Sequence, residues 1–210
     1  MSDAASPPLP LRERKKQRTR QALIDTAGEL FAERGVDSTT LDDLCAAVEI
    51  SKRTFFRNFP SKEAVAMAPL HDLWAAFLAH LDHATPATGT LLDLLQDTLV
   101  AAVRETAVDG WPRRATRSHG LARTTPALAA HNLQFCDQTT RSALDLLHRD
   151  LRLTDDLHAR LALDILVAAF HCALDTWSAR TTFGTPELIA ELRAAFAAVP
   201  GALTMRVEPR

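Results

Sequence analysis

Residues 40–60 read TLDDLCAAVEISKRTFFRNFP and have the pattern of two short helices. Thr40 is a residue type that caps helix N-termini, and Asp43 stands three residues later, where a capping box places its acidic side chain. Ser51 offers a second N-cap, and Pro60 ends the second helix because the residue before proline avoids the helical conformation. The stretch therefore predicts two capped helices, beginning at Thr40 and at Ser51.

The turn between the two predicted helices is about three residues long, Val48–Ile50. Two short helices with such a turn, docked on a longer helix, form a helix-turn-helix, whose second helix enters the major groove of DNA. Phe55 and Phe59 stand one turn apart and can anchor the second helix on a core. The other face then presents hydrogen-bonding side chains at its start, namely Ser51, Lys52, Arg53 and Thr54. A plain helical hairpin with a solvated basic face is the alternative.

A longer helix is predicted before this stretch, over about residues 14–34. Its apolar residues recur at the spacing of one helix face, with Leu23, Ala27, Leu30 and Phe31. Gly35 follows as a C-cap, because glycine takes a positive φ without steric cost. The N-terminal part of the chain is therefore expected to hold three helices.

Basic residues are concentrated in the same part of the chain. The segment from Arg12 to Arg20 carries six bases and one acid, and all four lysines lie within residues 1–62. Residues 63–210 carry 13 arginines against 17 acids, although the net charge of the whole chain is only -2. This asymmetry favours a nucleic-acid module followed by a domain with another task, and a solvated basic helix end is the alternative reading.

The rest of the chain also has helical apolar spacing, with neither alternating β-branched runs nor a hairpin signal. The pattern predicts an all-α fold of about nine helices, in which Pro69 kinks the fourth and the eighth is apolar nearly all round. Such a helix is either a central core helix or one with a face for a second subunit. The expected organisation is a disordered arm (1–12), a helix-turn-helix domain (13–60), a second helical domain (61–202) and a loose tail (203–210).

Composition and motifs exclude several classes of function. The three cysteines are scattered and odd in number, so we expect a reducing compartment and no disulfide framework. The N-terminus is polar and proline-rich, unlike a signal peptide, and the longest apolar run, Ile165–Phe170, is far shorter than the ~20 residues of a membrane span. We find neither convergent metal ligands nor a phosphate loop, a G-x-S-x-G or an H-E-x-x-H motif. We therefore expect no metal, no cofactor and no enzymatic activity.

The strings GVDSTTL (35–41) and SKRTFFRNFPSKE (51–63) strongly resemble the DNA-binding domain of TetR-family transcriptional regulators, over about residues 14–65. The resemblance implies a bacterial, cytoplasmic protein that binds a double-stranded DNA operator as a homodimer. It also implies a repressor that a small-molecule ligand releases, with a C-terminal domain for ligand binding and dimerisation. One alternative is a helix-turn-helix regulator without such a ligand, controlled by a partner or acting as an activator. An all-α enzyme is a remote alternative.

The resemblance also assigns roles to individual side chains. Thr39 and Thr40 would approach one phosphate, and Lys62 would contact another. Phe56 stands where the family usually has tyrosine, which makes its contact apolar, and Asn58 keeps a hydrogen-bond donor. The full expected DNA-binding set comprises Thr39, Thr40, Ser51, Lys52, Arg53, Thr54, Phe56, Asn58, Lys62 and, in the basic segment, Arg14, Lys15, Lys16 and Arg18. The basic segment would neutralise phosphates or reach into a minor groove.

Two departures from the family pattern bear on the DNA contacts. Glu49 occupies a turn position where glycine is usual, and a positive φ there would cost ~1–2 kcal/mol. Its negative charge would also lie near the DNA backbone. Arg53 replaces another frequent glycine, and because an arginine fork suits guanine O6 and N7, we expect a G·C pair in each half-site.

For the second domain, the resemblance implies a pocket among the fourth to eighth helices and dimerisation through the eighth and ninth. The pocket candidates are Trp74, Phe77, Trp111, His119, Phe135, Phe170 and His171. The dimer candidates are Leu157, Leu161, Ile165, Leu188 and Leu192. The string Arg53–Lys62 looks like that of a subgroup with acyl-CoA-responsive regulators, so the expected ligand is largely apolar. Plain core packing is the alternative for each of the aromatic side chains.

Overall fold

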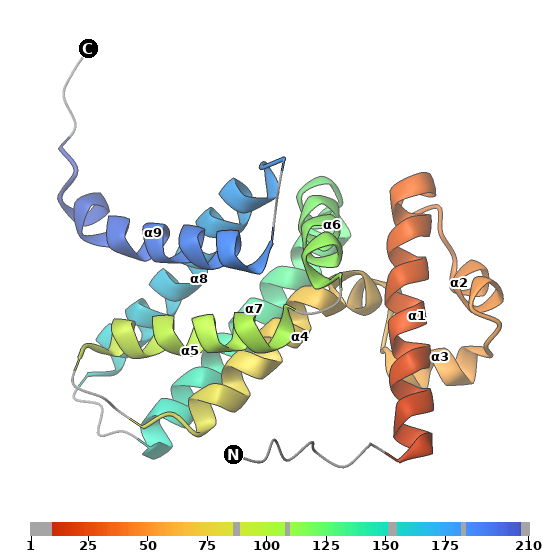
Figure 1. Cartoon of the computed structure of the whole chain (residues 1–210), viewed down its shortest axis with the longest axis horizontal. Coiled ribbons are helices and arrows are strands. Elements are labelled where there is room, and N and C mark those ends of the chain that lie inside the picture. The colour runs from red at the N-terminus through yellow and green to blue at the C-terminus, as the bar shows by residue number, and fades with distance from the viewer. Residues whose placement is uncertain (1–9, 86–88, 108–109, 151–154, 182–183, 207–210) are drawn as a thin grey trace, which may run out of the picture. The chain divides into compact units, whose positions relative to one another are not determined.

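The computed structural model describes residues 10–85, 89–107, 110–150, 155–181 and 184–206. These residues form nine α-helices and no strand, which confirms the all-α prediction (Figure 1). The helices are α1 (Leu11–Arg34), α2 (Leu41–Ala47), α3 (Lys52–Asn58), α4 (Lys62–Asp82), α5 (Leu91–Thr106), α6 (Trp111–Thr124), α7 (Pro126–Asp150), α8 (Asp156–Ser178) and α9 (Thr185–Thr204). The chain divides into two compact units, which meet within α4 between Ala68 and Pro69.

The two short helices of the first unit begin at the caps that the sequence predicts. Thr40 Oγ1 accepts a hydrogen bond from the Asp43 amide at 3.1 Å, and Asp43 Oδ2 accepts one from the Thr40 amide at 2.8 Å. Ser51 Oγ accepts a hydrogen bond from the Thr54 amide at 3.2 Å. Because these caps pair amides that a helix leaves without partners, α2 and α3 start sharply although each spans only seven residues.

Two phenylalanines hold the inner face of α3, as predicted. Phe55 and Phe59 are both buried, and their ring centroids lie 6.3 Å apart. The guanidinium of Arg20 on α1 lies 4.9 Å from the centre of the Phe59 ring, which is a cation–π contact. Arg20 therefore stabilises the docking of α3 on α1.

The basic segment at the N-terminus is helical. α1 begins at Leu11, with Pro10 at its N-cap, so Leu11 and Arg12 do not belong to a disordered arm as expected; residues 1–9 lie outside the described residues. The reason is local, because arginine, lysine and glutamine have high helix propensities. These bases stand near the positive end of the helix dipole, where cations are unfavourable. Stability of the helix therefore does not explain them.

α4 gives its first turns to the first unit and its later turns to the second. The side chains of Ala64–Ala68 are all buried, and the first unit ends with this segment rather than at Pro60, where the sequence places the end of the DNA-binding domain. Pro69 follows inside the helix, and its carbonyl accepts a hydrogen bond from Trp111 Nε1 at 2.9 Å. This bond fixes the beginning of the second unit to α6.

Aromatic side chains form much of the core of the second unit. The ring of Trp74 meets Phe77 edge-on at 5.4 Å and Phe170 edge-on at 5.1 Å. Trp177 is fully buried, and its Nε1 donates to the carbonyl of Gly184 at 3.0 Å. The indole bond joins the end of α8 to the start of α9, the two helices with the most extensive packing in the unit.

α9 is longer than the sequence suggests. It continues through Pro200 to Thr204, so Leu203 and Thr204 are helical and the expected loose tail does not begin at residue 203. Thr204 Oγ1 donates to the carbonyl of Pro200 at 3.1 Å, which ties down the last turn. Residues 207–210 lie outside the described residues.

Two stretches have the length and composition of a membrane-crossing helix, within Lys52–Asp82 and Asp156–Ser178, with mean hydropathies of 1.2 and 1.5. Core helices of soluble proteins pass the same test. In the first stretch 61% of the apolar window is buried, as expected of a core helix. In the second stretch, which is α8, only 39% of the apolar window is buried. The described residues therefore leave much of the apolar surface of α8 exposed.

Candidate nucleic-acid interface

The outer face of α3 presents charged and aromatic side chains. Lys52, Arg53 and Arg57 are exposed, and Phe56 is 52% exposed. Phe56 stands edge-on to the buried ring of Phe55, with centroids 5.5 Å apart. Because the inner face of the helix is anchored, this outer face is held in a fixed orientation and is accessible to a duplex.

Three predicted contacts of α3 are engaged within the helix itself. Ser51 Oγ and Thr54 Oγ1 lie 3.2 Å apart, and the former also caps the helix. Asn58 Nδ2 donates to the carbonyl of Thr54 at 2.7 Å, so one of its two N–H donors is used within the helix. The Oδ1 atom of Asn58 is buried without a hydrogen-bond partner. These three side chains shape α3 more than they extend from it.

The structure changes the role expected of Thr39. Its side chain is only 1% exposed, and its hydroxyl donates to the carbonyl of Gly35 at 2.8 Å. Thr39 therefore fixes the loop between α1 and α2 and does not reach a phosphate through its side chain. Thr40 is exposed, but its hydroxyl donates to Asp43 Oδ2 at 2.6 Å within the capping box. Two hydrogen bonds from Thr40 also hold the pKa of Asp43 below its ordinary value.

Lys62 at the start of α4 also supports this loop. Its Nζ donates to the carbonyl of Val36 at 2.8 Å and lies 3.4 Å from the carbonyl of Thr39. An ammonium group has three N–H donors, so one remains for a phosphate. Lys62 therefore orders the loop and is compatible with the phosphate contact that the sequence suggests.

The two bases at the start of α3 differ in their surroundings. Lys52 Nζ lies 2.9 Å from Asp42 Oδ1 on α2, and this hydrogen bond and charge raise the pKa of Lys52 above its ordinary value. Arg53 forms no ion pair with any described residue. The Arg53 guanidinium is therefore available to a ligand, whereas the Lys52 ammonium is already paired.

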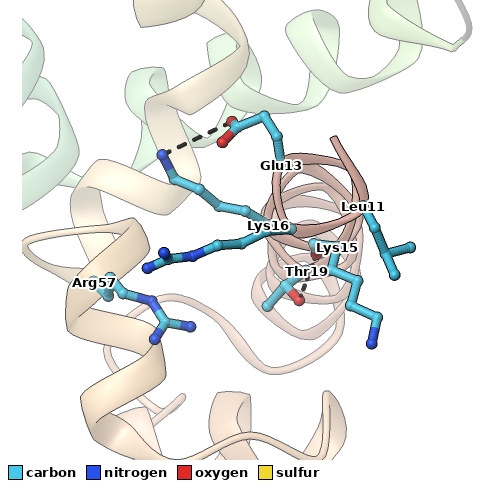
Figure 2. A pocket seen from close by; sticks show the side chains of 7 residues that line it. Leu11, Glu13, Lys15, Lys16, Thr19 and Arg57 are labelled. Atoms are coloured by element: carbon cyan, nitrogen blue, oxygen red, sulfur yellow. Dashed lines mark hydrogen bonds and ion pairs between the residues drawn. The ribbon is translucent and has the colours of Figure 1, made fainter. Parts of the chain in front are cut away.

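A basic cleft of about 910 Å³ lies between the start of α1 and the end of α3 (Figure 2). Its lining comprises Leu11, Arg12, Glu13, Lys15, Lys16, Thr19 and Arg57. Figure 2 shows Arg57 of α3 and Lys16 of α1 on facing sides of the gap, with Lys16 Nζ 3.9 Å from Glu13 Oε1. Four bases against one acid give this cleft a positive potential suited to phosphate.

Arg57 is absent from the set that the sequence predicts, although it stands one helical turn after Arg53 and on a nearby face of the same helix. That spacing was the signal available. Arg14 and Arg18 are exposed and line a separate, shallow depression on α1, away from this cleft. The structure therefore divides the basic segment into a part that faces α3 and a part that does not.

The turn between α2 and α3 is a Schellman motif with glutamate at its left-handed position. The Glu49 amide donates to the carbonyl of Ala46 at 3.2 Å, and the Ile50 amide donates to that of Cys45 at 2.9 Å. Glu49 has a φ of 55°, and among the described residues it is the one non-glycine residue with a positive φ. The strain that the sequence led us to expect is therefore present at this position.

Replacing Glu49 by glycine should stabilise the first unit by about 0.5–1 kcal/mol, since the relief of the left-handed strain exceeds the entropy that glycine adds to the unfolded chain. Chemical denaturation followed by circular dichroism measures this change. Glu49→Ala is the matched control, because it removes the charge and keeps a β-carbon at the strained position. Equal stabilisation by both variants would show that charge, not backbone strain, sets the effect.

In the second unit the structure separates the pocket candidates into three groups. Phe77 and Phe170 each pack edge-on against Trp74 in the core, and Trp111 is buried with its indole N–H bonded. These four serve as core, the alternative that the sequence left open. Phe135 stacks on His71, with ring centroids 3.6 Å apart, and so belongs to neither the core cluster nor the groove described next.

His119 and His171 line an open groove of about 540 Å³ on α6, α7 and α8. At one end, His119 Nε2 lies 2.8 Å from Asp175 Oδ1, and Arg123 also hydrogen-bonds this carboxylate. Burial raises the pKa of Asp175, but the bonds from His119 and Arg123 hold it below its ordinary value. The other walls are mostly apolar and include Ala122, Ala129, Leu133, Val167 and Ala168. The described residues show no group of three or more His, Cys, Asp or Glu side chains that could hold a metal.

The dimer candidates also divide. Leu188 and Leu192 are fully buried within their own unit, so α9 uses them for its own packing and they cannot meet a second subunit. Leu157 and Leu161 on α8 are 65% and 48% exposed, and Ile165 is half-buried. The outer face of α8 is therefore the part of the expected interface that is still available.

Comparison with known sequences places the similarity in the first unit. Residues 23–68 match the profile of the bacterial regulatory proteins of the tetR family. The chain is 50% identical over 72 residues to the HTH-type transcriptional regulator TcmR of Streptomyces glaucescens, covering 34% of this chain and 32% of that protein. It is 44% identical over 43 residues to IcaR of Staphylococcus aureus, the negative transcriptional regulator of the biofilm operon icaADBC, covering 20% of this chain and 23% of that protein. The matches span less than a third of the length of these curated relatives.

Solved structures share the fold over most of the chain. The structure of Thermus thermophilus FadR, a TetR-family transcriptional repressor in complex with lauroyl-CoA, has a TM-score of 0.51 and 20% identity, and the match covers 91% of this chain and 98% of that one. The SmeT–triclosan complex has a TM-score of 0.54 and 20% identity, with coverage of 89% and 91%. At this identity the likeness shows the fold.

Proposed function

Because residues 23–68 match the tetR family of bacterial regulatory proteins, we propose that the chain is a cytoplasmic, homodimeric repressor that a small molecule releases from its operator. The observation that carries the proposal is the orientation of α3. Lys52 and Arg53 are exposed at its start, while Phe55 and Phe59 anchor its inner face. In a helix-turn-helix, the residues at this position meet base edges in the major groove.

The contacts to DNA fall into two kinds. Among the described residues Arg53 forms no ion pair, and the two parallel donors of its guanidinium fork suit O6 and N7 of guanine, so we assign it the reading of a G·C pair in each half-site. The basic cleft with Lys16 and Arg57 would hold backbone phosphates and fix the register of the protein on the duplex. The exposed ring of Phe56 would make an apolar contact, to a thymine methyl or a sugar.

Neutralising the basic cleft should weaken binding without changing sequence preference. For the double variant Lys16→Gln/Arg57→Gln, the slope of log affinity against log salt should fall in magnitude by about 0.9 per lost phosphate contact. The preference between an operator fragment and its scrambled counterpart should stay as in the wild type, because phosphates carry no sequence information. Fluorescence anisotropy between 50 and 200 mM salt measures both quantities, within the range where phosphate contacts are sensitive. Arg14→Gln/Arg18→Gln is the control of equal charge, and a changed sequence preference in the cleft variant would contradict this assignment.

For the ligand, we propose the groove on α6, α7 and α8, whose apolar walls end in the polar cluster of His119, Arg123 and Asp175. Such a groove suits a largely apolar molecule with one polar group that fixes its orientation. FadR of Thermus thermophilus and SmeT were solved with lauroyl-CoA and triclosan, which supports an apolar ligand for this fold. The outer face of α8, with Leu157 and Leu161, is the surface that we propose for the homodimer.

The direct test is a binding assay with DNA that flanks the protein's own gene, repeated with long-chain acyl compounds and other apolar metabolites. The proposal expects specific binding that at least one such compound weakens, and Leu133→Arg on the groove wall should remove the response. Specific binding that no compound affects would favour the second candidate, a regulator controlled by a partner protein. The packed cluster of Trp74, Phe77 and Phe170 favours that candidate, since these predicted pocket residues fill the core.

A further inference from the structure

Asp42 and Lys52 form an ion pair across the helix-turn-helix. The carboxylate is in the first turn of α2 and the ammonium is in the first turn of α3, with 2.9 Å between Nζ and Oδ1. Both side chains are largely exposed, at 74% for Asp42 and 55% for Lys52. Asp42 takes no part in the capping box of α2, which Thr40 and Asp43 form, although a carboxylate in the first turn also favours the helix dipole. The pair thus stands on the outer surface, apart from the hydrogen bonds that cap α2.

We propose that Asp42 is a specificity-determining residue, which neutralises Lys52 so that this lysine reads DNA by hydrogen bonding and does not attract DNA by charge. The inference rests on the DNA-binding function proposed above. It concerns the discrimination between operator and other DNA, which that proposal leaves open.

The physical basis is that a neutral ion pair affects sequence-independent binding to phosphates and sequence-specific binding to bases differently. Binding to any sequence depends on counterion release, which grows with each positive charge brought to a phosphate. A lysine that keeps its carboxylate partner brings no net charge, so it adds little to this term. The ammonium still has donors left when one is bonded to Asp42, and these can reach base acceptors. The pair therefore lowers affinity for random sequences more than affinity for the operator.

The carboxylate of Asp42 has a second effect that also lowers the affinity for random sequences. If Lys52 turned away from Asp42 to contact a phosphate, the unpaired carboxylate would stay close to the DNA backbone. Its repulsion of the phosphates would oppose that contact, which is how interfaces discriminate against wrong partners. An exposed ion pair is worth only about 0–1 kcal/mol, so Lys52 can exchange its bond to Asp42 for a bond to a base when other contacts align the helix. Arg53, the neighbouring base without an ion pair among the described residues, can supply that alignment.

The test compares Asp42→Asn with the wild type on an operator fragment and on a scrambled duplex of equal length. Glu29→Gln is the matched control, because Glu29 is exposed on α1 and forms no ion pair among the residues described. For Asp42→Asn, affinity for the scrambled duplex should rise roughly threefold to tenfold, and the salt slope should steepen by about 0.9. Affinity for the operator should rise less, so that the ratio of the two affinities falls. Glu29→Gln should leave the salt slope close to that of the wild type.

A third variant shows whether Asp42 acts through Lys52. In Asp42→Asn/Lys52→Gln, the steeper slope and the gain on the scrambled duplex should both disappear, since the released charge is no longer there. Circular dichroism verifies that each variant folds. If Asp42→Asn binds both duplexes with the slope of the Glu29→Gln control, the inference is wrong while the DNA-binding function stands. If the wild type shows no preference for any duplex, the proposed function fails and takes the inference with it.

Discussion

Replacing Phe55 by alanine should remove a large part of the stability of the first unit and strongly weaken DNA binding. Phe55 is fully buried beneath α3, with Phe59 and Phe56 at ring distances of 6.3 and 5.5 Å. Truncating a buried phenylalanine to alanine costs about 3–5 kcal/mol, and a whole domain is stabilised by only about 5–15 kcal/mol. Since α3 spans seven residues, it has too little intrinsic stability to persist without this anchor.

Phe56→Ala is the matched control for that variant. It removes the same side chain from the next position, where the ring is 52% exposed, so stability should fall by less than half as much. Thermal unfolding followed at 222 nm and anisotropy with operator DNA separate the two variants. Equal loss of stability in both would show that Phe55 is not the anchor of α3.

Stability of the second unit should fall by about 2 kcal/mol when the pH is lowered from 7 to 5. His71 on α4 is largely buried, and its ring stacks on Phe135 at 3.6 Å. Its Nε2 is buried and has no hydrogen-bond partner among the described residues. Burial, with a smaller contribution from His131, lowers the pKa of His71 to about 3. In the unfolded chain the pKa returns to about 6.5. Protons therefore bind the unfolded state more strongly, so the contribution is complete above pH 6.5 and is lost as the pH falls towards 3.

His71→Phe isolates this effect, because it keeps a planar ring against Phe135 and cannot take a proton. The variant should lose most of the difference in unfolding free energy between pH 7 and pH 5. The bond to Asp156 raises the pKa of His148, which adds a pH dependence of its own, so only the difference between wild type and variant is diagnostic. Denaturation at both pH values measures it. An unchanged pH dependence in the variant would mean that His71 already carries a proton in the folded protein.

In the first unit the sequence predicts well those features, such as helix caps, that form between residues close together in the chain. Thr40 and Asp43 are three positions apart and meet in a capping box, and Ser51 caps the next helix in the same way. Gly35 has a φ of 82°, as a glycine C-cap requires. The start of α1 was missed because Pro10 stands at its N-cap and provides no side-chain cap to recognise.

The contacts that were not predicted join residues far apart in the chain. Lys62 bonds to carbonyls more than twenty residues away, and Lys52 pairs with Asp42 across two helices. The helical spacing of Leu188 and Leu192 predicts that they share a buried face, but it does not tell whether their own unit or a second subunit covers that face. Both are fully buried on α9, which packs on α8 and α5, so packing within the unit takes the place of the expected interface.

The affinities of wild type and Lys52→Ala/Arg53→Ala for operator and scrambled duplexes, measured at one salt concentration, show whether the start of α3 reads base edges. Each good contact to a base contributes about 1–3 kcal/mol of discrimination. The double variant should fold as the wild type does but lose roughly tenfold to several hundredfold of its preference for the operator. A double variant that binds the operator as tightly and as selectively as the wild type would contradict this role of α3.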